Sequence, residues 1–321
     1  MRRLLIIGCG DVALRALPLL LPHYRVYALL RDPARHAEWR AKGAIPVTGD
    51  LDDRTSLWRI AGIADAVLHF APPASGKSPL PPFAEGGRAY RPAEISPLCK
   101  RGAKGGFSAI DARTRNLLAA LSLGTLPKRL VYISTSGVYG DCGDAQVSET
   151  RPPRPKTTRG QLRADAERQV REWAVRNRVN ASILRVPGIY AADRLPLERL
   201  RTNSPTILAK EDNYTNHIHA DDLAHIAVAA LHRGRPNRAY HASDDGELKM
   251  GDYFDAVADA YGLPRPPRLP RAAIERSVSP ALWSFMSESR RLLNRRMKTE
   301  LGVRLRYPTV ASMLNELRGS R

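Results

Sequence analysis

The chain has 321 residues, and 43% of them are hydrophobic, which is enough for one large or two smaller domains with a buried core. This hydrophobic fraction excludes an intrinsically disordered chain. The formal net charge of +19 would attract nucleic acid, anionic lipid or acidic small molecules. Because no basic motif with interleaved aromatic residues accompanies the charge, we interpret it first as a solvated surface and do not favour nucleic-acid binding.

Cysteine usage and the start of the chain indicate a compartment. Cys9, Cys99 and Cys142 show no paired or metal-type spacing, which is typical of a reducing cytoplasm. Asp11 and Arg15 interrupt the apolar first residues, so these do not read as a signal peptide. No later stretch is apolar for long enough to span a bilayer. We therefore expect a cytoplasmic protein without a membrane partner.

Strand and helix patterns alternate through the first 71 residues. Apolar runs at 2–7, 25–31, 44–48 and 64–71 predict four buried strands. Helices are predicted to begin at Asp11, after Asp32 (with Pro33 at the first helical position) and around Leu57, Trp58 and Ile60. Pro18 lies inside the first helix and removes one of its hydrogen bonds. This alternation predicts a parallel sheet with helices on both faces.

Residues 74–109 break the pattern. They are rich in proline, glycine and basic residues, and they contain a rough internal copy that begins at Ser78 and again at Ser96. Without them, an ordinary strand-to-helix connection remains. We interpret the segment as an inserted, mostly unstructured low-complexity loop, with a lid or partner-binding arm as the alternative.

The alternation of strands and helices then resumes, and the predicted elements become shorter toward the end of the chain. Helices are predicted near 116–121 and over Arg159–Asn177, with strands at 129–134 and 181–186. Beyond Pro187 the predicted elements are shorter, with strands at 205–209, 216–219 and 238–243, a helix at 220–231 and a helical tail. The basic run 288–298 is predicted to form an amphipathic surface helix with Leu292, Leu293 and Met297 inward.

The turn after the first strand carries the most informative motif. Gly8-Cys9-Gly10-Asp11-Val12-Ala13 fits G-x-G-x-x-G/A between a strand and a helix. The first glycine permits the turn, the second lets a pyrophosphate approach the backbone, and the alanine allows close helix packing. The helix N-terminus favours phosphate groups. We therefore predict a dinucleotide-binding Rossmann domain over 1–186 and a smaller, mixed, mainly substrate-binding lobe over 187–321, some of whose elements return to the sheet; the alternative is a purely structural turn.

Two further positions bear on the dinucleotide. Arg31 ends the second strand, where an acidic residue would bind the ribose of NAD and an arginine suits the 2′-phosphate of NADP. Asp32 is better explained as the helix cap, so NADP is favoured over NAD. Asp50 follows the third strand, and contact with the adenine or a capping role are equally acceptable there.

The loop after the strand at 129–134 brings hydroxyl groups to the carboxyl end of the sheet. Thr135 is placed to hydrogen-bond a substrate oxygen, although a Ser/Thr turn is the alternative. His217 and His219, followed by Asp221 and Asp222, show no third ligand at metal-site spacing. We expect a strand and a helix cap there, and no metal.

Taken together, these motifs resemble the short-chain dehydrogenase/reductase superfamily, most of all its extended epimerase/dehydratase members. The resemblance rests on G-C-G-D-V-A, G-D-L, V-L-H-F-A, I-S-T-S-G-V-Y-G-D, L-R-V-P-G-I-Y, N-H-I-H-A-D-D-L-A and E-L-G-V-R-L-R-Y-P-T. It implies that Thr135 is the catalytic hydroxyl residue and that a homodimer forms through long helices. It also implies cofactor contacts around Gly8, Gly10, Arg31, Asp50, Leu51 and Ala71.

The family's Tyr-x-x-x-Lys pair is missing here. Aligning A-D-A-E with the family's helix places Arg159 at the tyrosine and Arg163 at the lysine. An arginine keeps its proton, with a pKa above about 12, so Arg159 cannot replace the tyrosine as an acid or base. A guanidinium instead binds carboxylate or phosphate, and residues four apart share a helix face. The alternatives are a solvated basic face or pairing of Arg163 with Glu167.

We therefore predict an NADP-preferring oxidoreductase or epimerase-like protein that acts on an anionic small molecule. Arg159 and Arg163 would bind the anion while Thr135 polarises the reacting oxygen. Tyr139, Tyr190 and Cys142 are substitute acids among which the sequence does not choose. The first alternative is a catalytically inactive nucleotide-sensing module, and the second is association with polyanions through the basic surface.

Overall fold

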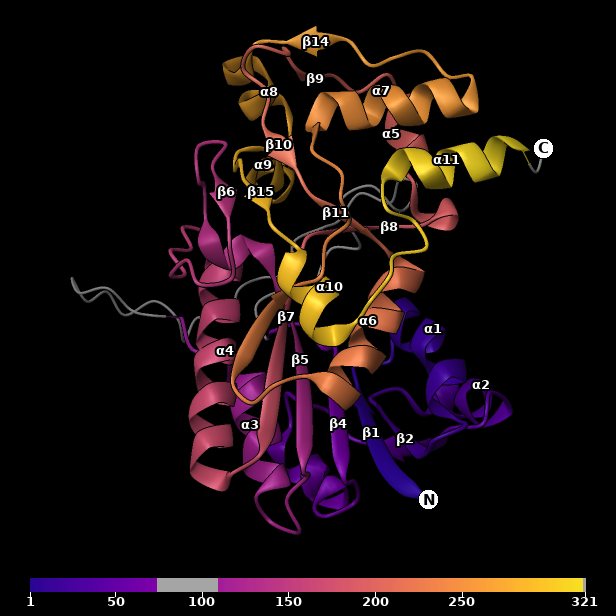
Figure 1. Cartoon of the computed structure of the whole chain (residues 1–321), viewed down its shortest axis with the longest axis vertical. Coiled ribbons are helices and arrows are strands. Elements are labelled where there is room, and N and C mark those ends of the chain that lie inside the picture. Colours follow the sequence, from indigo (N-terminus) through magenta and orange to yellow (C-terminus); the bar gives the residue numbers. More distant parts are fainter. Residues whose placement is uncertain (74–108, 320–321) are drawn as a thin grey trace.

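A computed structural model describes residues 1–73 and 109–319 (Figure 1). A seven-stranded, fully parallel sheet forms its centre, in the order β12-β7-β5-β4-β1-β2-β3. Its strands are β1 (Arg2–Ile7), β2 (Tyr24–Leu30), β3 (Ile45–Thr48), β4 (Ala66–His69), β5 (Arg129–Thr135), β7 (Asn180–Val186) and β12 (Arg238–His241). The predicted doubly wound fold is confirmed, and the expected loop at 74–109 lies, except for its last residue, outside the described residues.

Helices cover both faces of the sheet because the side chains of each strand alternate between two apolar cores. In β1, Leu4 and Ile6 face one core, whereas Leu5 and Ile7 face the other. The first core is covered by α1 (Asp11–Leu20), α2 (His36–Ala41) and α6 (Ala220–Arg233), and the second by α3 (Ala112–Leu121), α4 (Thr158–Asn177) and the 3₁₀ helix η2 (Arg54–Ile60). Asp32 accepts a hydrogen bond from the Ala34 amide and caps the 3₁₀ turn η1 (Pro33–Arg35), as predicted.

A smaller lobe with its own core lies above the carboxyl ends of the strands (Figure 1). Its helices are α5 (Leu197–Arg201), α7 (Met250–Tyr261), α8 (Arg271–Ser277), α9 (Pro280–Met286) and α11 (Val310–Gly319). Eight short strands form four two-stranded sheets outside the central one: β6 (Gln146–Val147) with β15 (Arg291–Leu292), β8 (Gly188–Tyr190) with β11 (His217–His219), β9 (Thr206–Ile207) with β14 (Arg268–Leu269), and β10 (Tyr214–Thr215) with β13 (Leu248–Lys249) in the described residues. Two 3₁₀ turns, η4 (Ser136–Tyr139) and η5 (Ala192–Arg194), flank the junction.

The basic run 288–298 does not form the single helix that its composition predicts. Residues 288–294 are not helical, and the short strand β15 within them pairs in parallel with β6 through Arg291 and Gln146. Helix α10 begins only at Arg295 and ends at Leu301. Met297 is buried as expected, but Leu293 is 40% exposed. The prediction was wrong because a distant strand edge offers these amides better hydrogen-bond partners than a local helix does.

No helix within residues 1–73 and 109–319 combines the length and the apolar character that a membrane span requires.

Candidate cofactor and substrate site

The glycine turn is built for close packing on one side and open space on the other. Gly8 has a φ of +88°, and a Cβ there would lie 2.3 Å from the Ala71 nitrogen, so only glycine fits. The amides of Phe70 and Ala71 both donate to the Ile7 carbonyl, which holds the strands β1 and β4 together at this point. A Cβ on Gly10 would meet no atom of residues 1–73 or 109–319 within 4 Å. The predicted turn therefore leaves room in front of its second glycine.

The start of α1 offers unoccupied backbone donors. Gly10 is the N-cap residue, and no side chain caps the helix. Amides at such an end attract an anion through the helix dipole. Asp11 adds a negative charge here, but it is paired with Arg15 at 3.0 Å and with Arg194 at 2.9 Å. Val12 is half-buried, and Ala13 is buried against the sheet, as the motif requires.

Two arginines follow the second strand. Arg31 is exposed and has no ion-pair partner among residues 1–73 and 109–319, although its charge helps Arg113 to lower the pKa of Asp52. Arg35 was not predicted: it donates a 2.8 Å hydrogen bond to the Cys9 carbonyl inside the glycine turn. No local motif marks Arg35, because its contact depends on how η1 folds back toward the turn. Burial raises the pKa of the Cys9 thiol to about 12, so this cysteine is a packing residue.

The remaining predicted cofactor positions border the same edge of the sheet. Asp50 closes a turn by accepting a 3.0 Å hydrogen bond from the Asp52 amide, while Asp53 is the residue that caps η2. The alternative of Asp50 as the helix cap was therefore wrong. Leu51 is buried, and its carbonyl accepts from the Asn116 amide group at 2.8 Å. Ala71 is buried beside Gly8.

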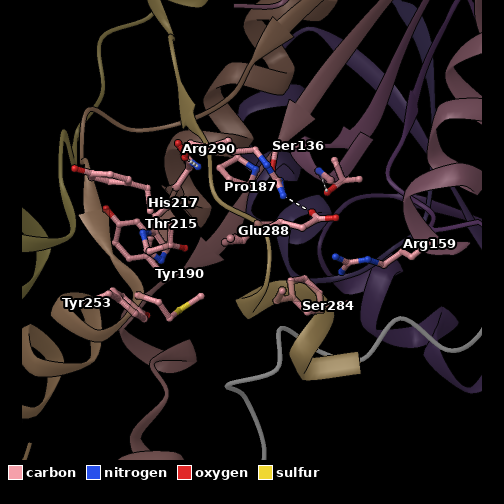
Figure 2. Close-up of a pocket in the computed structure, with 18 of the residues that line it drawn as sticks. Ser136, Arg159, Pro187, Tyr190, Thr215, His217, Tyr253, Ser284, Glu288 and Arg290 are labelled. Atoms are coloured by element: carbon pink, nitrogen blue, oxygen red, sulfur yellow. Dashed lines mark hydrogen bonds and ion pairs between the residues drawn. The ribbon is translucent and has the colours of Figure 1, made fainter. Parts of the chain in front are cut away.

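A cavity of about 260 Å³ opens between the carboxyl ends of β5 and β7 and the smaller lobe (Figure 2). Thr135 and Arg159 both line it, so the structure brings these two predicted residues together. The Thr135 hydroxyl also accepts a 3.2 Å hydrogen bond from the Gly137 amide. Thr135 thus forms the Ser/Thr turn and faces the cavity at the same time.

Arg159 enters the cavity from the first turn of α4. Its guanidinium lies 3.6 Å from the centre of the Phe285 ring, a cation–π contact. Within the part of the chain that the structure describes, no hydrogen-bond or ion-pair partner meets this guanidinium. Burial, together with the charge of Arg163, lowers the pKa of Arg159 to about 10. The side chain remains a cation at neutral pH and cannot act as the missing acid.

Arg163 points elsewhere. Its guanidinium donates to the Ile133 carbonyl at 2.6 Å and to the Tyr132 hydroxyl at 3.1 Å, and it does not line the cavity. Glu167, proposed above as its partner, instead binds Arg185 at 2.7 Å and the Ser134 hydroxyl at 2.6 Å. The two arginines therefore do not form a joint anion pocket, because Arg163 donates a hydrogen bond to the Ile133 carbonyl of β5 and does not reach the cavity.

The segment after α9 contributes two residues that sequence reasoning missed. Glu288 and Arg290 form an ion pair at the cavity wall, each with about 9% of its side chain exposed. Arg290 also donates to the Gly140 carbonyl at 3.2 Å and to the Ser136 hydroxyl at 3.5 Å. Glu288 Oε1 is buried without a hydrogen-bond partner within residues 1–73 and 109–319. Both residues were assigned to a surface helix, and nothing in the local sequence contradicts that assignment.

Aromatic side chains form the opposite wall of the cavity. The His217 and Tyr253 rings stack at 4.3 Å, and Tyr190 packs against His217 edge to face (Figure 2). Burial lowers the pKa of His217 to about 3, so this ring is neutral at neutral pH. In the described ranges 1–73 and 109–319, no group of three histidine, cysteine or acidic residues could hold a metal ion.

None of the three substitute acids is poised for proton transfer. Tyr139 is buried between Arg185 and His241, with both contacts at 2.6 Å, and burial raises its pKa to about 12. Burial also raises the pKa of Tyr190, with Asp244 adding to the effect, and raises that of Cys142. The pKa of each of these three side chains is therefore raised, whereas an acid/base catalyst in place of the tyrosine would need a lowered one.

Comparison with known proteins places this geometry in context. Residues 107–316 match the family model described as the RmlD substrate binding domain. The dTDP-glucose 4,6-dehydratase of Mycobacterium tuberculosis is 27% identical over an alignment of 241 residues that covers 67% of this chain and 66% of the relative. Its counterpart from Mycolicibacterium smegmatis is 26% identical over the same shares. The match thus spans just under two thirds of the length of these relatives.

Solved structures agree over the whole chain. A functionally unknown conserved protein from Silicibacter pomeroyi is 26% identical with a TM-score of 0.72, covering 100% of this chain and 99% of that one. DesIV from Streptomyces venezuelae, a dTDP-glucose 4,6-dehydratase with NAD and TYD bound, is 20% identical with a TM-score of 0.71, covering 99% and 98%. At 20% identity, the similarity to DesIV shows a shared fold and nothing more.

Proposed function

Because the chain belongs to the RmlD substrate-binding family of extended short-chain dehydrogenase/reductases, we propose that it binds a nicotinamide dinucleotide and acts on an anionic small molecule. The observation that carries this proposal is the meeting of Thr135 and the unpartnered guanidinium of Arg159 in one cavity. DesIV and other dehydratases of this fold bind NAD, which supports the cofactor class.

The residues at the glycine turn fit a dinucleotide. The pyrophosphate would occupy the open space in front of Gly10, where the backbone amides at the N-terminus of α1 would donate hydrogen bonds to it. Arg31, exposed at the end of β2, would bind the 2′-phosphate, and Arg35 would add a second positive charge beside the turn. When bound, the nicotinamide supplies or accepts hydride. NADP is therefore the favoured cofactor.

Within the cavity, Arg159 would bind the carboxylate or phosphate of the substrate, and Thr135 would hydrogen-bond its reacting oxygen. A guanidinium buried on an aromatic ring is less hydrated than an exposed one, so its attraction for an anion is stronger. The lobe that carries Phe285 covers this site and limits the access of water.

Calorimetric titration with NADPH and NADH tests the cofactor assignment. The wild-type protein should bind NADPH about tenfold more tightly than NADH, and Arg31→Ala should remove this difference. Arg25→Ala is the matched control, because Arg25 is an exposed arginine near the other end of β2. Tighter binding of NADH, or equal effects of both substitutions, would refute the NADP preference. Absence of binding to either dinucleotide would refute the proposed function.

A nucleotide-binding protein without turnover is the second candidate. It is favoured by one observation, namely that Arg159 stands where an acid/base is required and keeps its proton. Steady oxidation of NADPH that depends on an added carbonyl compound would exclude this candidate.

A further inference from the structure

We propose that Arg159 and Glu288 form a two-point site for a hydroxy carboxylate, with its carboxylate on Arg159 and a hydroxyl group on Glu288. This inference rests on the proposed function and names the substrate class of the same cavity. Figure 2 shows the two charged groups directed toward each other from α4 and from the segment after α9. Both residues line the cavity.

The two groups do not satisfy each other. The guanidinium of Arg159 forms no ion pair with Glu288 within 4 Å, although its pKa responds to the Glu288 charge. Glu288 uses Oε2 for Arg290 and leaves Oε1 buried without a partner in the described part of the chain. A buried carboxylate oxygen without a hydrogen bond is unfavourable, because it has lost its contact with water without gaining another donor. A ligand that reaches both groups would remove this cost.

The chemistry of each group defines the ligand. Arg159 has only donors, so it requires an anionic or strongly accepting group such as a carboxylate. Glu288 is an acceptor, so it requires a donor. Because Arg290 already balances the charge of Glu288, a neutral hydroxyl fits better there than an ammonium group, which would add a further cation beside Arg159 and Arg290.

The cavity also limits the size of the ligand. At about 260 Å³ it lies slightly below the range of roughly 300–1,000 Å³ that is usual for drug-sized ligands. The aromatic wall of Tyr190, His217 and Tyr253 suits the apolar face of a compact polyol. A sugar acid or another short hydroxy acid meets all of these requirements.

Calorimetry with a panel of compounds tests the proposal. The hydroxy carboxylates are D-gluconate, D-glucuronate, L-tartrate and D-glycerate, while hexanoate carries only the carboxylate and D-glucitol only the hydroxyls. We expect at least one hydroxy carboxylate to bind the wild-type protein at least tenfold more tightly than hexanoate or D-glucitol. Arg159→Gln and Glu288→Gln should each weaken that binding about tenfold, because each removes one charge-assisted contact.

Arg168→Gln is the matched control. Arg168 lies on the same helix as Arg159, is 57% exposed and pairs with Asp165 and Glu172 away from the cavity. The Arg168→Gln variant should bind the hydroxy carboxylate as tightly as the wild-type protein does. NADPH titrations of every variant report whether the sheet domain is intact, since none of the three substituted residues lies at the glycine turn.

Three outcomes would overturn the inference. One is that none of the four hydroxy carboxylates binds while NADPH does, which would leave the cofactor proposal standing. Another is that hexanoate or D-glucitol binds as tightly as the hydroxy acids. The third is that Arg159→Gln and Glu288→Gln change the unfolding free energy but not ligand binding, which would make the pair structural. If the wild-type protein does not bind NADPH or NADH, the proposed function itself is refuted.

Discussion

Arg194, in the turn η5 of the smaller lobe, donates a 2.9 Å hydrogen bond to the carboxylate of Asp11, the first residue of α1. The same carboxylate accepts from Arg15, which also pairs with Asp221 at 2.7 Å. A negative side chain at the expected pyrophosphate position is thereby neutralised by the two domains together. Arg194 also lines the substrate cavity, so it connects the two halves of the site.

Arg194→Ala should weaken NADPH binding about threefold to fivefold, because the half-exposed Asp11 carboxylate would then repel the phosphates. Asp11→Asn combined with Arg194→Ala should restore the wild-type affinity. Calorimetric titration of the two variants measures this directly. If the double variant binds as weakly as Arg194→Ala, the effect does not pass through Asp11.

The two glycines of the turn should differ in their response to alanine. Gly8→Ala should lower the free energy of unfolding by about 1–3 kcal/mol or more, because φ is +88° and the new Cβ meets Ala71. Gly10→Ala has neither problem and should fold normally, yet its methyl group would project into the space expected for the pyrophosphate. Urea unfolding and NADPH titration of both variants separate the two roles. Equal stability of the two variants would contradict this assignment.

A buried ion pair under the site should be essential for stability. The side chains of Glu167 and Arg185 are each about 4% exposed. Arg185 also donates a hydrogen bond to the Tyr139 hydroxyl, which in turn is hydrogen-bonded to His241. Glu167→Gln should cost about 3–5 kcal/mol, because it leaves a buried guanidinium without its counter-ion.

The matched control lies on the same helix. Glu172→Gln removes a carboxylate that is 53% exposed and pairs with Arg168, so its cost should stay below about 1 kcal/mol. Urea unfolding of the two variants gives both numbers. Similar losses would show that burial of the Glu167 pair does not set its contribution.

Stability should fall as the pH decreases below about 6.5. Burial lowers the pKa of His69, His217 and His241 from 6.5 to about 3, so the folded protein keeps these rings neutral while the unfolded chain binds protons. The unfolded state therefore gains protons as the pH falls from 6.5 toward 3, and each histidine contributes a slope of up to about 1.4 kcal/mol per pH unit.

Urea unfolding between pH 7 and pH 5 measures this slope. His217→Phe should reduce this slope by up to about 1.4 kcal/mol per pH unit, since the phenyl ring can occupy the stacked position against Tyr253 without titrating. His225→Asn, at an exposed position on α6, is the control substitution. A slope that does not respond to His217→Phe would assign the pH dependence to other groups.

Local features of the sequence determined the sheet domain. The alternation of apolar residues in β1, the cap at Asp32 and the turn from Gly8 to Ala13 each depend on a few neighbouring residues. The same local reading predicted that Arg159 and Arg163 occupy the family's tyrosine and lysine positions, and it placed Thr135 after the strand that became β5 and Arg159 at the start of the helix that became α4. These conclusions could be drawn because strand, helix and turn preferences act over short distances along the chain.

Only the tertiary structure decided which of these groups meet. Ser289 donates to Asp141, 148 residues earlier in the chain, and this pairing keeps the segment after α9 non-helical and brings Glu288 and Arg290 to the cavity. The carbonyl of Ile133 takes Arg163 away from Arg159. Such partners compete for each donor according to distance in space, and local periodicity carries no information about that distance. The sequence by itself therefore determined the fold, whereas the composition of the cavity depended on contacts between remote segments.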